Sequence, residues 1–241
     1  MDLAYAKTLL GRATALYDEF EKMIANGRLW GVQERRDTKT GEWAYSIVID
    51  RQRISDATPL IADCANNVSS ALDHIAAAIA RDEGHGRLNN LYFPFSLDDA
   101  EFEKRVAAAE KVLGPKMSNI IRVAHHEHRH VANHVASAKQ ISNDGKHWEL
   151  RATSGKAHAI KWLAENDYVG QMFSIPSTAF DKDDSYEFHR SAKRLPKPRR
   201  YETMIGFEIE GLGDLVKAPT SIFPCSFRYV QGVIDAVSKG G

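Results

Sequence analysis

A cluster of histidines between residues 125 and 134 is the densest group of side chains suited to metal binding. Within it, His126, His130 and His134 are four residues apart, so on a helix their rings would lie along one face, as metal ligands require. However, His126 and His130 fall opposite the apolar stripe of that helix, where they would face water. We therefore expect no bound metal and no cofactor, and we keep these three histidines as the alternative metal ligands.

His74 is the second residue whose type suggests chemistry. Together with Asp73 it interrupts an alanine-rich stretch, residues 71–80, and Asp63 and Asn67 lie on the same flank of the helix. Imidazole titrates near neutrality, so His74 suits a general acid or base. The competing interpretation is a core histidine that ties two helices together, because a buried ring needs hydrogen-bond partners. We favour the structural role.

A short polar segment, residues 143–147, offers such partners. It sets an amide, a carboxylate, an amine and an imidazole around Gly145, which predicts a turn. Turns of this composition are typical of functional loops and also of helix ends, where Asn and Asp satisfy free backbone groups. We expect His74 to contact this segment. The candidate catalytic residues are therefore Asp73, His74, Asn143, Lys146 and His147.

The segment from Arg190 to Arg200 is the local basic patch of the chain, with six Lys or Arg residues and two prolines. Phosphate contact would suit it, so it is the candidate surface for an RNA or protein partner. It has no interleaved aromatic residues for base stacking, and a solvated connection between strands is the simpler interpretation. Phosphate-binding glycine loops and a serine-nucleophile elbow are absent from the sequence.

The elements that position these residues predict an α+β fold. An amphipathic helix over residues 3–25 precedes a β-hairpin at 28–51. The alanine-rich helix over 59–83 is apolar on most faces, which places it at the centre of a bundle of four or five helices. The remaining helices are expected at 98–113, at 116–142 as one helix or two, and at 147–165. Beta-prone runs fill residues 171–210, and a closing helix begins at about Pro224.

This pattern divides the chain at about residue 165. Residues 1–165 form the helical bundle with its inserted hairpin, and residues 166–241 form a β-rich segment and the closing helix. We expect the second part to pack on the hairpin as one unit.

Composition excludes several classes of protein. Lys plus Arg and Asp plus Glu each total 32, so the net charge is zero, which argues against a general nucleic-acid-binding surface. The two cysteines form no metal or disulfide motif, and neither a signal peptide nor an apolar run long enough for a membrane span is read. These features predict a cytoplasmic protein that does not enter a membrane, and they leave a homodimer open.

Three motifs in order resemble a known group. Residues 67–75 (NVSSALDHI) resemble the NLRSALDHL helix of a broad group of uncharacterised bacterial proteins. Residues 91–95 (LYFPF) match the QFPIF segment that follows it in that group. Residues 142–148 (SNDGKHW) match the later NNIDKHR segment. The RSALDH core is in turn similar to the Arg-x4-His signature of HEPN domains, many of which are metal-independent ribonucleases.

The resemblance implies a HEPN-like helical module, but one catalytic position differs. Ser69 stands where the signature has its arginine, so the cation that would contact the scissile phosphate is missing, while His74 keeps the histidine. We therefore predict a non-enzymatic or degenerate HEPN-like module that acts through protein or RNA contact. The alternative is a hydrolase that uses His74, either as a metal-independent ribonuclease with the segment 143–147 or as a metal-dependent bundle enzyme with the histidines at 126–134.

Overall fold

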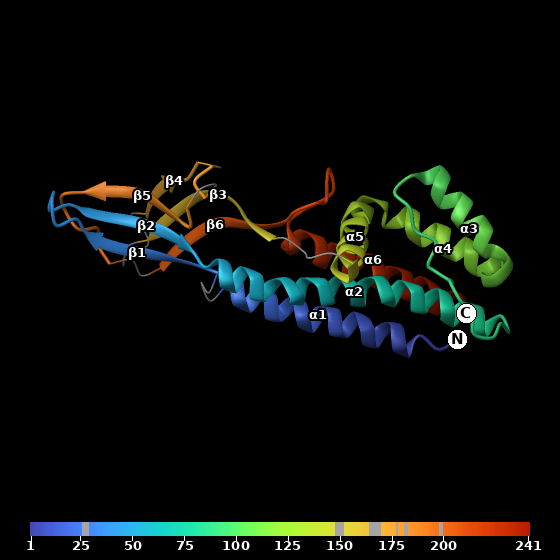
Figure 1. Cartoon of the computed structure of the whole chain (residues 1–241). Coiled ribbons are helices and arrows are strands. Elements are labelled where there is room, and N and C mark those ends of the chain that lie inside the picture. The colour runs from blue at the N-terminus through green and yellow to red at the C-terminus, as the bar shows by residue number, and fades with distance from the viewer. Residues whose placement is uncertain (26–28, 148–151, 164–169, 177, 181–182, 198–199) are drawn as a thin grey trace. The chain divides into compact units, whose positions relative to one another are not determined.

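A computed structural model describes the chain except residues 26–28, 148–151, 164–169, 177, 181–182 and 198–199 (Figure 1). The side chains of residues 25, 146–170 and 198–207 also lie outside the description. The fold is α+β, as the sequence predicts. Its helices are α1 (Ala4–Ala25), α2 (Arg51–Asp82), α3 (Asp99–Leu113), α4 (Pro115–Glu127), α5 (Ala132–His147) and α6 (Pro219–Gly240), with a 3₁₀ turn at Arg129–Val131. Its strands are β1 (Trp30–Arg36), β2 (Trp43–Ile49), β3 (Ala152–Leu163), β4 (Gly170–Ser174), β5 (Ser185–Ser191) and β6 (Arg200–Ile209).

The chain forms two compact units. The helical unit comprises Met1–Glu21, Thr58–Leu150 and Glu210–Gly241, and the strand unit comprises Lys22–Ala57 and Arg151–Ile209. This division differs from the predicted boundary at residue 165, because the closing helix α6 belongs to the helical unit. Its buried face, which includes Phe223, Tyr229 and Val233, packs against α4 and α5.

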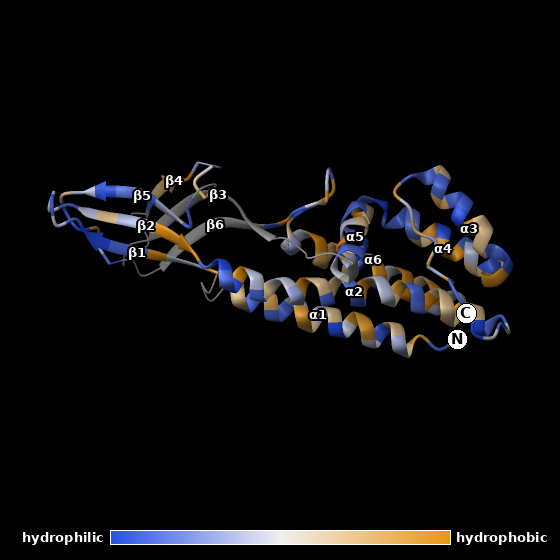
Figure 2. Cartoon of the chain, viewed as in Figure 1, coloured by the Kyte–Doolittle hydropathy of each residue, from blue (hydrophilic) through white to orange (hydrophobic). Residues whose placement is uncertain are grey.

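Helix α2 lies at the centre of the helical unit. Its alanines at 71, 76, 78 and 80 are buried, as expected for a helix with neighbours on several sides. Helix α1 runs antiparallel to it: Tyr5 lies against His74, and the Cys64 thiol donates to the Ala13 carbonyl. Both helices carry the mixed hydropathy of amphipathic helices (Figure 2). Helix α2 begins at Arg51 rather than at Pro59, because Asp50 caps it by accepting from the Arg53 N–H.

Residues 116–142, predicted as one helix or two, form two, α4 and α5, joined by the 3₁₀ turn Arg129–Val131. At the end of α4 the Ala124 carbonyl oxygen accepts the His128 backbone N–H at 3.2 Å and lies 3.0 Å from the His128 Nδ1. Helix α5 then continues to His147, so the turn expected around Gly145 does not form. Residues 152–163 were expected to be helical and instead form β3, which pairs on one side with β4 and on the other with β6.

The strand unit contains two antiparallel three-stranded sheets, with strand orders β1-β2-β5 and β4-β3-β6. In the first sheet β2 is the middle strand, and its Tyr45, Ile47 and Ile49 are buried. Figure 2 shows that β5 and most of β1 are hydrophilic. Among the described residues, none of the helices has the length and apolarity needed to cross a membrane.

Candidate functional site

His74 and Asp73 hold two neighbouring segments against α2. The His74 ring is half-buried and lies 4.4 Å, centroid to centroid, from the ring of Tyr5 on α1. The Asp73 Oδ1 accepts a hydrogen bond of 2.9 Å from the Phe93 N–H in the loop before α3. Adjacent residues of one helix thus fix the start of α1 and an extended loop. The tilted ring contact of His74 with Tyr5 and the Asp73 hydrogen bond are packing contacts between these segments.

Among the residues whose side chains are described, the segment 143–147 makes no contact with His74. Asn143 is exposed on α5, Asp144 is half-buried, and no described contact joins either residue to His74. The side chains of Lys146 and His147 lie outside the described residues. Helix α5 instead meets α2 through Ser142, whose Oγ donates to the Asn66 Oδ1 at 2.7 Å. Asn66 precedes His74 by about two turns, or about 12 Å along the helix.

The three histidines of the alternative metal site are separated by the break between α4 and α5. His126 is exposed and faces Glu103 at 3.7 Å, and His130 is exposed in the 3₁₀ turn. His134 is half-buried on α5. No group of three or more His, Cys, Asp or Glu residues in the described parts of the chain has the geometry to hold a metal. The spacing of four residues would align these rings only on an unbroken helix.

His125 is the buried histidine of this region, and the sequence analysis did not single it out. Its ring is fully buried and stacked at 3.8 Å on Phe102, and its Nδ1 lies 2.8 Å from the Tyr229 hydroxyl. Burial lowers the pKa of His125 from its ordinary 6.5 to about 4, so the ring is neutral near pH 7. Its position four residues after Ile121, on the apolar stripe of α4, was the available signal.

His134 and Ser221 form a histidine–serine pair within the helical unit. The His134 Nε2 lies 3.1 Å from the Ser221 Oγ, while its Nδ1 is buried without a partner among the described residues. A serine nucleophile needs Nε2 to accept its proton, which requires the hydrogen on Nδ1 and an acceptor that orients it. With no such acceptor, the tautomer with Nε2–H donating to the serine is favoured. The pair therefore joins α5 to α6 rather than activating a nucleophile.

An open groove of about 490 Å³ runs between α1 and α2. Charged and amide side chains line it above a small apolar floor: Arg12, Glu19, Asp63 and Asn67, with Ala15 and Leu16. Among the described residues, Arg12, Glu19 and Asp63 form no ion pair. In the sequence, the feature that indicated this groove was the polar flank of α2, which contains Asp63 and Asn67. Charged side chains of both signs, with no ion-pair partner among the described residues, therefore meet in this groove.

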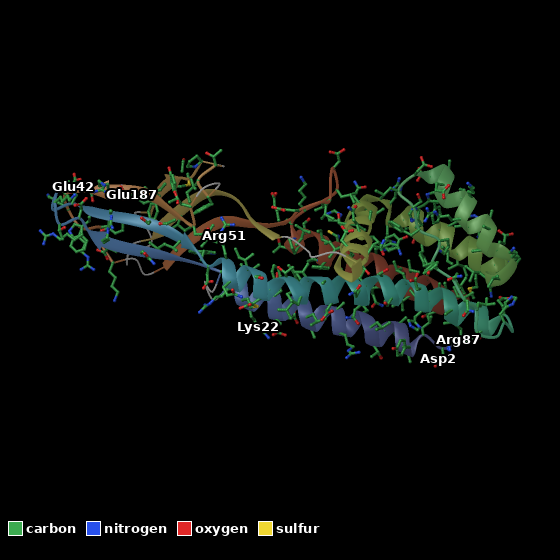
Figure 3. The ribbon with its side chains drawn as sticks, viewed as in Figure 1. Asp2, Lys22, Glu42, Arg51, Arg87 and Glu187 are labelled. Carbon is green, nitrogen blue, oxygen red and sulfur yellow. The ribbon has the colours of Figure 1, made fainter. Side chains whose placement is uncertain are left out.

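In the basic segment from Arg190 to Arg200, the arginines whose side chains are described are paired with acids. Arg190 contacts Glu187 at 2.7 Å, Asp37 at 2.9 Å and Glu42 at 3.8 Å. Glu42 and Glu187 lie at the same end of the β1-β2-β5 sheet (Figure 3). Arg194 pairs with Glu34 and covers the ring of Trp43 at 4.9 Å. These two arginines therefore offer less positive charge to a phosphate than the sequence suggests. The side chains of residues 199 and 200 lie outside the described residues.

Comparison with other proteins gives no template for these sites. No protein-family model, no curated protein and no solved structure matches the chain. A function for the chain must therefore come from the chemistry of its own residues.

Proposed function

We propose that this chain is a non-enzymatic, HEPN-like helical module that acts by contacting other protein chains. One observation carries the proposal: Ser69, which replaces the signature arginine, is only 8% exposed on α2. A buried hydroxyl offers neither the charge nor the access that contact with a scissile phosphate requires. The His74 ring, at the position of the signature histidine, packs against the ring of Tyr5.

Protein contact is favoured over RNA contact by the distribution of charge. The net charge of the chain is zero, and Arg190 and Arg194 are already paired with carboxylates. RNA binding draws its affinity from unpaired Lys and Arg side chains at phosphates. The groove between α1 and α2 instead presents both signs of charge beside Ala15 and Leu16, a composition that suits a protein surface.

Site-specific photo-crosslinking in cells distinguishes a protein partner from an RNA partner. A photoreactive amino acid replaces Ala15, which lines the groove, and in a matched control it replaces Lys7, an exposed residue of the same helix. Lys7 projects about 140° away from Arg12, so it lies off the groove. We expect discrete protein adducts from position 15 and much weaker adducts from position 7. Adducts from position 15 that disappear on ribonuclease treatment would contradict the proposal.

A further inference from the structure

The groove between α1 and α2 has a charge pattern that complements itself. Arg12 and Glu19 lie on α1 with Leu16 between them, and all three line the groove. They are seven residues apart, about 10 Å along the axis and within about 20° of the same helix face. This face of α1 is therefore positive at one end and negative at the other, with the apolar Leu16 between them.

A two-fold axis through the middle of this face would place Arg12 of each copy opposite Glu19 of the other. When two copies of α1 lie antiparallel, Arg12 faces Glu19 of the partner subunit, and Glu19 faces Arg12 of the partner subunit. A two-fold interface requires this reciprocity, in which residue i contacts residue j and j contacts i. Leu16 would then lie on the axis against its own copy.

Helix α2 contributes Asp63 and Asn67 to the groove. Because α1 and α2 are antiparallel, with Cys64 beside Ala13 and His74 beside Tyr5, Asp63 lies level with residues 14–16 of α1, near the middle of the groove. Asn67 lies near Arg12. One of its amide N–H groups donates to the Asp63 backbone carbonyl, and the other is available to the partner's Glu19. None of the three charged residues has an ion-pair partner among the described residues of its own chain.

We propose that the α1–α2 groove is a self-association surface, on which a second copy of this chain seats its own α1 antiparallel. The proposal rests on the proposed function and deepens it, because it names the partner chain. In this dimer, Arg12 of each copy forms an ion pair with Glu19 of the other, across a two-fold axis at Leu16.

Charge reversal tests the proposal through the mass of the full chain, measured by sedimentation equilibrium over a wide concentration range. The wild type is expected to dimerise. Arg12→Glu and Glu19→Arg each turn two attractive pairs of the dimer into repulsive ones, so the dissociation constant should rise by about tenfold or more. The double variant Arg12→Glu/Glu19→Arg restores complementarity and should dimerise like the wild type. Lys7→Glu, on another face of α1, should leave the constant unchanged.

Mixing the single variants gives a second readout. On this face of α1 the Arg12→Glu chain carries two acids and the Glu19→Arg chain carries two bases. An equimolar mixture should therefore form heterodimers at concentrations where each variant alone is mostly monomeric. Leu16→Cys should form an intermolecular disulfide under mild oxidation, because the two sulfurs would meet on the axis, and Lys7→Cys should not.

A wild type that stays monomeric at all concentrations would overturn the self-association surface, as would a dimer that neither reversal weakens. These outcomes differ from failure of the proposed function. If protein adducts form at position 15 while the chain is monomeric, a different protein occupies the groove and only this inference fails. If the adducts contain RNA, the proposed function itself fails.

Discussion

Burial of the His125 side chain makes the stability of the helical unit depend on pH. The His125 ring is stacked on Phe102 and fully buried, and its pKa is lowered to about 4, chiefly by loss of solvent and secondarily by the nearby positive Arg129. An unfolded chain binds the same proton near the ordinary pKa of 6.5. The neutral ring therefore contributes its full share of stability above about pH 6.5, and this share is lost as the pH falls from 6.5 toward 4.

We predict that His125→Phe makes the chain less sensitive to acid. Phenylalanine keeps a ring against Phe102 but cannot bind a proton, and each unit of pKa shift corresponds to about 1.4 kcal/mol. Between pH 6.5 and 4.5 the free energy of unfolding of the wild type should fall by about 2 kcal/mol more than that of the variant. Urea unfolding at both pH values measures this. Equal losses in the two proteins would show that His125 does not titrate as a buried group.

At the scale of the elements, two glycines show whether helix packing or helix propensity dominates. Gly232 lies in α6, and a methyl group placed there would overlap the ring of His128, which is held to the Ala124 carbonyl. Gly11 lies on the exposed side of α1, and a methyl group there would meet nothing within 4 Å. The same substitution should therefore have opposite effects at the two positions.

We predict that Gly11→Ala stabilises the chain by up to about 1 kcal/mol, because alanine is the better helix former. Gly232→Ala should destabilise it by about 1–3 kcal/mol through overpacking. The double variant Gly232→Ala/His128→Ala should recover part of that loss, since the clashing ring is gone. Denaturant unfolding of the wild type and the three variants measures these changes in the free energy of unfolding. A stabilising Gly232→Ala would mean that α6 does not pack against His128 as described.

The elements that could be read from the sequence were those with strong local signals. The hairpin, the alanine-rich helix α2 and the helix beginning near Asp98 were predicted from local pattern, and the structure has all three. The sequence left open whether residues 116–142 form one helix or two. Strand β3 could not be read, because its pairing with β4 and β6 decides it. Gly145 illustrates the same limit, since α5 passes through a residue that usually ends helices.

The candidate site was harder to predict than the fold. The sequence drew attention to His74 and to the histidines at 126–134, but ring contacts and exposure depend on which helix lies alongside. Tyr5 meets His74 because α1 runs antiparallel to α2. The groove involves Arg12 and Glu19 from one helix and Asp63 from another, and their meeting is a property of tertiary structure.

At the scale of the whole molecule, the balance of charge sets what the chain can bind. The 32 basic and 32 acidic residues cancel, and Arg190 and Arg194 of the strand unit are neutralised by their neighbours. A net charge of zero gives RNA little long-range attraction. The proposed protein contact through the groove between α1 and α2 agrees with this balance of charge.

An RNA cleavage assay with the purified chain tests the proposed non-enzymatic function most directly. Single-stranded and hairpin RNAs labelled at both ends are incubated with wild type and with His74→Ala, without and with added divalent metal, and thermal melts confirm that both proteins are folded. We predict no cleavage by either protein above the buffer control, because the proposed HEPN-like site has the buried Ser69 at its arginine position and lacks the cation that would contact a scissile phosphate. Cleavage by the wild type that is lost in the folded His74→Ala variant would contradict it.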